Sequence, residues 1–116
     1  MRERRTQTRI PINCTALVRE AQRCVREGQG KTRTCRTVNI SVAGVELRAR
    51  GPFEVGSTLE VEIHLTHKCA VFNHVGRVLW SREDAPRRHV FGVLFISTER
   101  NVLVAWQKRI AGLSDL

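Results

Sequence analysis

The chain has 116 residues, a length that fits one domain. Hydrophobic residues make up 41% and charged residues 27%, a composition that argues against a disordered or membrane-embedded protein. The net charge is +9, and 17 of the 20 basic residues are arginine; residues 1–50 hold 12 bases and 4 acids, whereas residues 51–116 hold 8 and 7. This uneven charge predicts either an anionic partner that meets the first half of the chain or a solvated basic face.

The first segment with a pattern, 15–27, has two interpretations. Apolar residues at 17, 21 and 24 or 25 recur at helical spacing, whereas residues 13–18 could equally form a strand. The sequence Gly28-Gln29-Gly30 predicts a turn after this segment. Residues 32–40 are rich in threonine, valine and isoleucine, which predicts a strand there.

Four further strands are expected. In segments 45–50 and 59–65, apolar and polar residues alternate, which is typical of a half-buried strand. Segments 71–80 and 90–96 carry apolar residues on both faces, and we interpret them as strands covered by another layer. Short strands separated by Gly-Pro, Gly-Ser and Asp-Ala-Pro turns favour an antiparallel sandwich or a small barrel.

The carboxy-terminal segment is predicted to be an amphipathic helix over residues 98–113. Its apolar residues recur by three, four and three: Leu103, Trp106, Ile110 and Leu113. Thr98 is suited to cap the start of the helix, and Gly112 is suited to its end. The apolar stripe has to cover part of the β structure, for which the open side or the mouth is the nearest candidate.

The cysteines and the apolar runs indicate a cytoplasmic protein. No apolar run is long enough to cross a bilayer, so we expect no membrane association. The cysteines show no C-x-x-C spacing and are expected to be reduced, with Cys14 and Cys35 buried in strands. A metal site from His64, His67 and Cys69 is not favoured, since nothing in the pattern brings them together. We therefore expect no metal and no cofactor.

Two short motifs are the best candidates for function. Arg5 and Arg9 form R-x-x-x-R, which by itself means little, because about two such pairs are expected by chance in this composition. The second motif, residues 39–44, reads N-x-S-x-x-G between two predicted strands. The side chains of Asn39 and Ser41 can hydrogen-bond their own backbone or a ligand, and Gly44 permits a positive φ or the close approach of another backbone.

An arginine-bearing R-x-x-x-R arm leading into a first strand, followed by [D/N]-x-S-x-x-G between the second and third strands, resembles the PilZ domain, a family of bacterial receptors for cyclic di-GMP. The similarity extends through Gly76-Arg77-Val78-Leu79-Trp80 and Phe91-Gly92-Val93-Leu94-Phe95, which look like the fifth and sixth strands of the family. It implies an all-β fold, a six-stranded antiparallel β-barrel with a C-terminal helix. It also implies that the start of segment 15–27 is the first strand.

The resemblance further implies a single domain over 1–116, with a flexible arginine-rich arm at 1–9, a barrel at 10–97 and a helix at 98–113. Arg5 and Arg9 would grip guanine edges and phosphate, and Asn39 and Ser41 would hydrogen-bond guanine or phosphate oxygens. Gly44 would keep the turn tight enough for the ligand to lie on the barrel. Asn39 replaces the commoner aspartate of the family. Arg4 lies directly before the motif. An arginine at this position resembles the pattern of family members that bind cyclic di-GMP as a stacked pair.

The leading hypothesis is therefore a non-enzymatic cyclic di-GMP receptor that changes conformation on binding and signals to a downstream protein. One alternative is a PilZ-like adaptor that works through protein contacts without a ligand. A second is a small basic barrel that binds nucleic acid. Aromatic residues make up only 5% of the chain and mostly fall in apolar stripes, which argues against the second alternative. The sequence shows no catalytic constellation, so we do not expect an enzyme.

Overall fold

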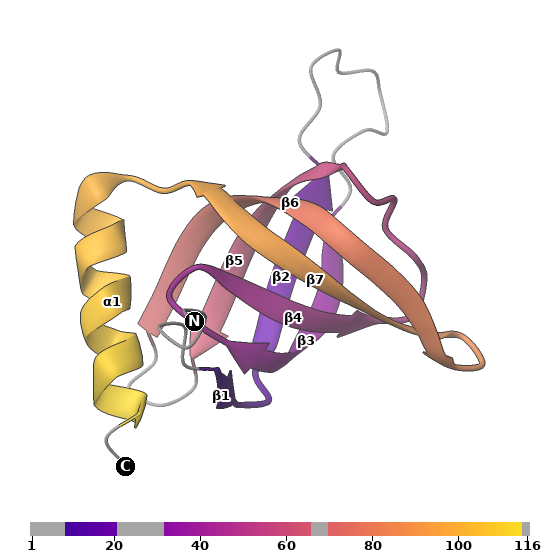
Figure 1. The fold of residues 1–116 in the computed structure, drawn as a ribbon, viewed down its shortest axis with the longest axis horizontal. Coiled ribbons are helices and arrows are strands. Elements are labelled where there is room, and N and C mark those ends of the chain that lie inside the picture. The colour runs from indigo at the N-terminus through magenta and orange to yellow at the C-terminus, as the bar shows by residue number, and fades with distance from the viewer. Residues whose placement is uncertain (1–8, 21–31, 66–69, 115–116) are drawn as a thin grey trace, which may run out of the picture.

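The computed structural model describes residues 9–20, 32–65 and 70–114. Within these ranges the chain forms seven strands and one helix (Figure 1). Their bounds are β1 Ile10–Pro11, β2 Thr15–Glu20, β3 Arg33–Ile40, β4 Gly44–Ala49, β5 Thr58–Leu65, β6 Ala70–Ala85, β7 Arg88–Ser97 and α1 Arg100–Ser114. The part of segment 15–27 that the structure describes is thus a strand, and its remainder from residue 21 lies outside the described residues.

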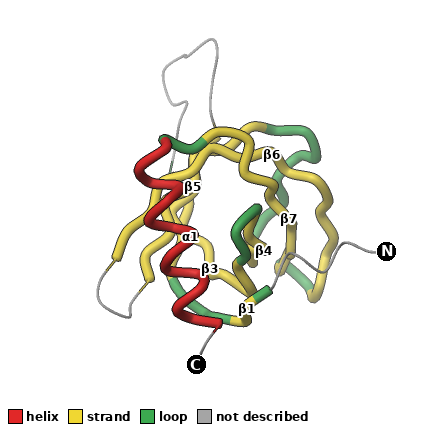
Figure 2. The backbone as a smooth tube through the Cα atoms, turned by 60° about the vertical axis from the view of Figure 1, so that its left-hand side comes forward, coloured by secondary structure: helices red, strands yellow, loops and turns green. Residues whose placement is uncertain are grey.

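The strands β2 to β7 close into a six-stranded antiparallel barrel. The order β3-β2-β5-β6-β7-β4 returns to its start because β4 also pairs with β3. The two-residue strand β1 adds to β3 beside this ring, where Ile10 lies opposite Ile40. Seen with the helix brought forward, the strands form a ring and α1 crosses one of its open ends (Figure 2). The predicted six-stranded antiparallel barrel with a C-terminal helix is confirmed; β1 was not predicted.

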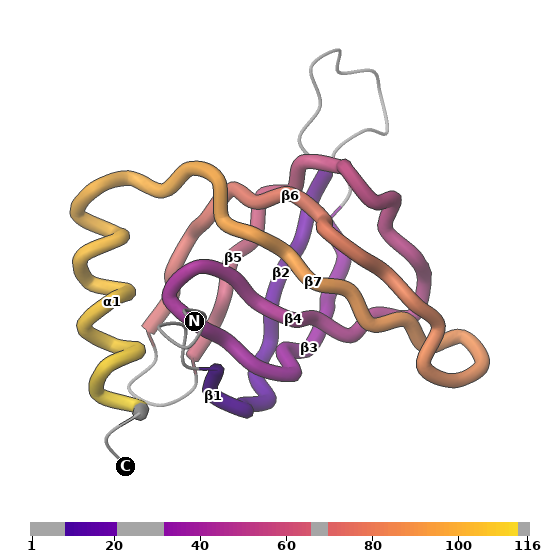
Figure 3. Tube along the Cα trace, viewed as in Figure 1, coloured from indigo at the N-terminus to yellow at the C-terminus, as the bar shows by residue number. Residues whose placement is uncertain are grey.

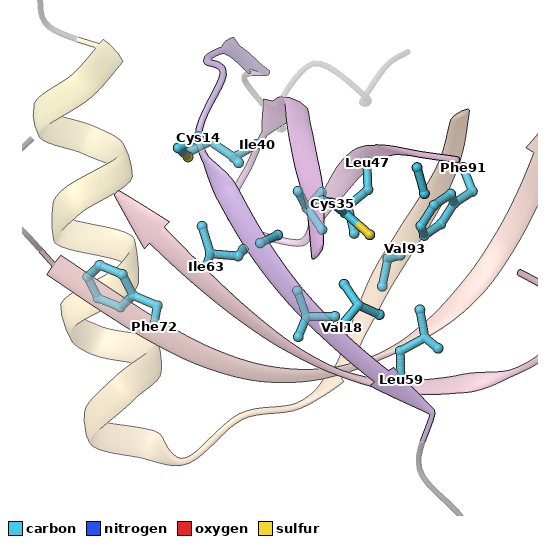
Figure 4. Packing of buried hydrophobic residues seen from close by; sticks show 14 of the residues in the cluster. Cys14, Val18, Cys35, Ile40, Leu47, Leu59, Ile63, Phe72, Phe91 and Val93 are labelled. Carbon is cyan, nitrogen blue, oxygen red and sulfur yellow. The ribbon is translucent and has the colours of Figure 1, made fainter. Parts of the chain in front are cut away.

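Alternation along the strands places one face of each strand in the core. In β4 the buried residues are Val45, Leu47 and Ala49, and in β5 every second residue from Leu59 to Leu65 is buried. Figure 4 shows side chains from β2 to β7 pointing into this common interior, with Phe72 turned toward α1. Regular inside–outside alternation is what fixes the register of such strands.

The hairpin of β6 and β7 is longer than predicted and extends away from α1 (Figure 3). Its register shifts at three places, among them between Val78 and Trp80. The expectation that both faces of these strands are covered is wrong at several outward positions: Val71, Leu79, Leu94 and Ile96 are exposed. Because a bulge puts an extra residue into one strand, two neighbouring apolar residues need not lie on opposite faces there.

The helix α1 covers the barrel mouth with Trp106 and Ile110, both buried in the core. It begins at Arg100, and Leu103 N–H donates to the carbonyl of Glu99 at 2.8 Å. The expectation that Thr98 caps the helix is wrong, because the Thr98 hydroxyl lies 3.0 Å from Nδ1 of His74 instead. Gly112 lies inside the last turn of the helix rather than after it.

Cys14 and Cys35 are free and buried in the core, as expected. Cys35 lies in β3 as predicted, whereas Cys14 directly precedes β2 and is not in a strand. Burial raises the pKa of the Cys35 thiol to about 11, which makes it a poor nucleophile. Cys24, His67 and Cys69 lie outside the described residues. In the described ranges, no three His, Cys, Asp or Glu side chains are grouped as a metal ion would need. No helix in those ranges is long and apolar enough to cross a membrane.

Candidate functional site

The N-x-S-x-x-G motif forms the tight connection between β3 and β4. Ser41 N–H donates to the carbonyl of Gly44 at 2.9 Å, and Gly44 N–H donates to the Ser41 hydroxyl at 3.2 Å. The same hydroxyl lies 3.3 Å from the Gly44 carbonyl, to which it can donate. Ser41 is nearly buried, so its hydroxyl serves the turn itself.

Gly44 is required by the close approach of a neighbouring strand. A Cβ atom at this position would lie 2.3 Å from the carbonyl oxygen of Val93 on β7. Among the described glycines, a positive φ occurs at Gly56 and not at Gly44. Of the two reasons that the sequence left open for this glycine, close approach to another backbone is therefore the correct one.

Asn39 and Arg9 meet at a carboxylate that the motifs do not include. Asn39 Nδ2 donates to Oε1 of Glu46 at 2.5 Å, and Nη1 of Arg9 lies 3.7 Å from the same oxygen. The Glu46 side chain is 15% exposed and that of Arg9 is 65% exposed. Arg9 thus reaches the outer surface around Asn39 and Glu46, which we call the Asn39 corner of the barrel. Its guanidinium is largely open to solvent.

A tryptophan stands next to this corner on the outer face of the barrel. Glu46 pairs with Gly92 across β4 and β7, and Gly92 pairs with Trp80 across β7 and β6. A Cβ atom on Gly92 would lie 2.3 Å from Nε1 of Trp80, so the indole lies over this glycine. The guanidinium of Arg82 in turn lies 5.2 Å from the centre of the Trp80 ring.

These surroundings form one concavity of about 210 Å³, which four of the six predicted site residues help to line. The lining residues are Arg9, Asn39, Ser41, Ala43, Gly44, Val45, Glu46, Leu79, Trp80, Gly92, Val93 and Leu94. The other two predicted site residues, Arg4 and Arg5, lie outside the described residues. Small-molecule pockets usually measure about 300 to 1,000 Å³, so the concavity can hold only part of a dinucleotide.

Sequence reasoning missed Glu46 and Trp80. The alternation of segment 45–50 places Glu46 on the wet face, and hairpin pairing then brings it opposite Asn39. This signal was available. Trp80 was assigned to an apolar stripe, but it lies half-buried on the outside. The bulge that turns it outward leaves no mark in the apolar pattern.

A larger concavity of about 590 Å³ lies elsewhere, along β2, β5 and β6 and the connection from β7 to α1. It contains none of the predicted site residues. Its lining includes Arg19, which pairs with Glu60, and the carboxylates of Glu62 and Glu99. This mixture with an excess of carboxylates is a poor match for an anion.

Behind the motif turn, the barrel end is filled by a cluster of aromatic rings. The His74 ring stacks on Phe95 at 3.9 Å and meets Trp106 edge-on at 4.7 Å. His74 is 3% exposed, and its Nε2 has no hydrogen-bond partner among the described residues. Burial lowers its pKa to about 4.

Comparison with known proteins places the chain in a family. The PilZ domain pattern matches residues 3–108, which covers the motif turn, Arg9 and the barrel. The chain belongs to the PilZ domain family. No curated protein sequence matches it.

Two solved structures share the PilZ fold. The inhibitor of motility MotI from Bacillus subtilis superposes with a TM-score of 0.78 at 13% identity; the match covers 97% of this chain and 52% of MotI. This PilZ chain therefore spans about half the length of MotI. The PilZ domain of YcgR from Escherichia coli, solved with c-di-GMP, superposes with a TM-score of 0.72 at 15% identity, and 97% and 93% of the two chains are covered.

Proposed function

We propose that this PilZ domain is a receptor for cyclic di-GMP that binds at the Asn39 corner of the barrel. The observation that carries the proposal is the convergence of four motif residues around one concavity: Arg9, Asn39, Ser41 and Gly44. R-x-x-x-R and N-x-S-x-x-G are separated by 29 residues of chain from Arg9 to Asn39, and the fold brings them together. The structural relative YcgR was solved with the same ligand.

The ligand offers two phosphates and two guanines, and the corner offers chemistry for both. Arg5 and Arg9 would supply forked N–H donors for guanine O6 and N7 and for phosphate oxygens. Asn39 uses its amide nitrogen on Glu46 and keeps Oδ1 for a ligand donor. We assign Ser41 and Gly44 mainly to holding the turn, since the Ser41 hydroxyl is engaged there.

The apolar part of the corner suits a purine face. The exposed residues Leu79 and Leu94 line the same concavity as Trp80. Stacking of a base on an aromatic ring contributes about 1 to 3 kcal/mol. Because the concavity is small, the rest of the ligand would lie on the outer barrel face, where the arm that carries Arg4 and Arg5 would close over it.

The domain would act by binding and not by catalysis. Ligand binding would change the surface that a downstream protein meets, and this change would carry the signal. We expect the protein to act in the cytoplasm of a bacterial cell.

Arg4 would supply an added cation for a second, stacked copy of cyclic di-GMP. Two copies carry four phosphate charges, which would need compensation. The excess positive charge of residues 1–50 can provide it.

Isothermal titration tests the proposal, with cyclic di-AMP as the matched control. Both dinucleotides carry two phosphate charges and differ in the base edges. We expect saturable heat with cyclic di-GMP, with a stoichiometry of one or two, and binding at least tenfold weaker with cyclic di-AMP, because arginine forks recognise O6 and N7 of guanine. Equal affinity for both ligands, or no heat with either in a folded sample at high micromolar concentration, would overturn it.

A ligand-independent adaptor remains the second candidate, favoured by one observation. Within the described residues, the polar groups of the corner already have partners of their own: Arg9 with Glu46, Asn39 with Glu46, and Ser41 with Gly44. Such a corner is stable without a ligand. In that case the titration gives no heat, and a downstream protein is bound equally well with and without cyclic di-GMP.

A further inference from the structure

The carboxy-terminal helix is joined to the motif turn by a buried hydrogen bond. Nε1 of Trp106 donates to the backbone carbonyl of Ser41 at 3.1 Å, across 65 residues of sequence. Trp106 is fully buried. The carbonyl belongs to the serine of N-x-S-x-x-G, so this contact reaches the turn from the barrel interior while the candidate ligand site lies on its outside.

We propose that Trp106 is a positioning residue for the candidate site: it fixes the Ser41 carbonyl, and through it the motif turn, in the geometry that binds ligand. The proposal rests on the proposed function for the identity of the ligand. It assigns α1 a part in binding that neither motif contains, and it makes the docking of α1 and the occupancy of the site depend on each other.

The position of the indole is well determined by its surroundings. Its ring meets Phe72 edge-on at 5.1 Å, Phe95 at 5.9 Å and His74 at 4.7 Å. Rings packed on several sides leave little freedom for the N–H to turn elsewhere. Because a buried carbonyl without a partner is costly, the turn is favoured in the position where Ser41 meets this donor.

Another contact ties the same turn to the outer strands. Phe95 N–H donates to the carbonyl of Ala43 at 2.8 Å, while Phe95 also packs in the cluster around Trp106. The turn is thus held at Ser41 by α1 and at Ala43 by β7. Displacement of α1 would release the first of these contacts and leave the Ser41 carbonyl free to move within the turn that joins Asn39 to Gly44.

Thermodynamic linkage gives the direction of the effect. If the ligand binds the turn in the position that Trp106 holds, then losing the indole donor weakens binding, and ligand binding stabilises the docked helix by the same factor. Couplings between sites usually amount to about 5- to 150-fold. For one hydrogen bond we expect the lower end of this range, about tenfold.

The test compares Trp106→Phe with Ile110→Val in the full chain. Trp106→Phe keeps an aromatic ring and removes the N–H donor, whereas Ile110→Val loosens the same helix by one methylene and keeps the bond. Hydrogen exchange is measured first, without ligand. Compared with wild type, the exchange rates of the Ser41 and Gly44 amides should rise at least several-fold in W106F and stay the same in I110V. Cyclic di-GMP should then bind about tenfold more weakly to W106F and within twofold of wild type to I110V.

Each outcome has a separate meaning. Unchanged exchange at Ser41 and Gly44 in W106F would overturn the positioning role whether or not the protein binds cyclic di-GMP. Faster exchange with an unchanged affinity would overturn the coupling. Absence of binding to the wild type would overturn the proposed function, while the exchange data still decide whether Trp106 holds the turn.

A measurement on the wild type covers the case in which W106F fails to fold. The indole N–H of Trp106 gives its own NMR signal, which Trp80→Phe identifies because the chain has two tryptophans. Saturation with cyclic di-GMP should slow the exchange of this indole N–H about tenfold. An unchanged or faster rate at saturation would contradict the proposal.

Discussion

Arg9 and Glu46 approach to 3.7 Å at the corner where Asn39 donates to the same carboxylate oxygen. In the candidate anion site, the cation Arg9 is therefore already paired with an anion of the protein, the Glu46 carboxylate. A phosphate that binds there must compete with Glu46 for the Arg9 guanidinium. Because this guanidinium is 65% exposed, the ion pair itself contributes little to stability, about 0 to 1 kcal/mol.

Replacing Arg9 with alanine separates binding from folding. We expect a loss of cyclic di-GMP binding free energy on the order of 2 to 5 kcal/mol, as for the loss of a desolvated charge contact, with unfolding free energy changed by less than about 1 kcal/mol. Isothermal titration measures the binding free energy, and urea unfolding measures the unfolding free energy. Arg88→Ala is the control, because Arg88 pairs with Asp84 in the β6–β7 hairpin. Equal effects of the two substitutions on affinity would place the ligand elsewhere.

Replacing Glu46 with glutamine should strengthen binding. The amide oxygen can still accept from Asn39, whereas the negative charge that competes for Arg9 and repels phosphate is lost. A unit charge about 7 Å away at a half-solvated site corresponds to roughly a two- to fivefold gain in affinity. Glu60→Gln, which removes the partner of Arg19 on β5, should leave affinity unchanged. Weaker binding by E46Q would mean that Glu46 accepts from the ligand.

Gly44→Ala should destabilise the fold. Its Cβ would be 2.3 Å from the Val93 carbonyl, a backbone atom that cannot turn aside. We expect a cost of about 2 kcal/mol, read as a lower urea midpoint. At Gly112 in α1 a Cβ meets nothing within 4 Å, so Gly112→Ala should be neutral or stabilising by up to about 1 kcal/mol. If G44A were as stable as G112A, close packing of β4 on β7 would be disproved.

The stability of the domain should fall in weak acid because of His74. Its pKa is about 4 in the folded protein and about 6.5 in the unfolded chain, so the unfolded state takes up a proton first. The stabilisation is fully present above pH 6.5 and is lost as the pH falls toward 4, by up to about 3 kcal/mol. Urea unfolding at several pH values measures this fall in unfolding free energy. His74→Phe should lose the fall, whereas His64→Gln should show the same fall as wild type. Parallel pH curves for wild type and H74F would contradict it.

Much of the fold could be predicted because one face of most strands is buried. Strict alternation identified β4 and β5, and a spacing of three and four identified the stripe of Trp106 and Ile110. Prediction failed where local geometry departs from this period. The bulge between Val78 and Trp80 placed apolar side chains outside. Thr98 has a suitable side chain for a cap, but it bonds His74, a residue 24 positions away that no local pattern can indicate.

The candidate site could be predicted as far as its motifs extend. Asn39, Ser41 and Gly44 lie close in sequence, so their turn was visible as turn chemistry. Glu46, Trp80 and Trp106 join the site through strand pairing and barrel closure, which depend on long-range contacts. The reason for Gly44 is long-range as well, since the Val93 carbonyl that excludes a Cβ comes from a strand 49 positions further along the chain.

The position of the ligand is tested most directly by amide and indole NMR shifts during titration with cyclic di-GMP. We expect the largest changes among the described residues around the smaller concavity, at Arg9, Asn39, Gly44, Gly92 and the Trp80 indole. The concavity beside Glu60, Asn73 and Glu99 should stay unchanged. Saturable shifts confined to that second concavity, or none at either place, would contradict binding at the Asn39 corner.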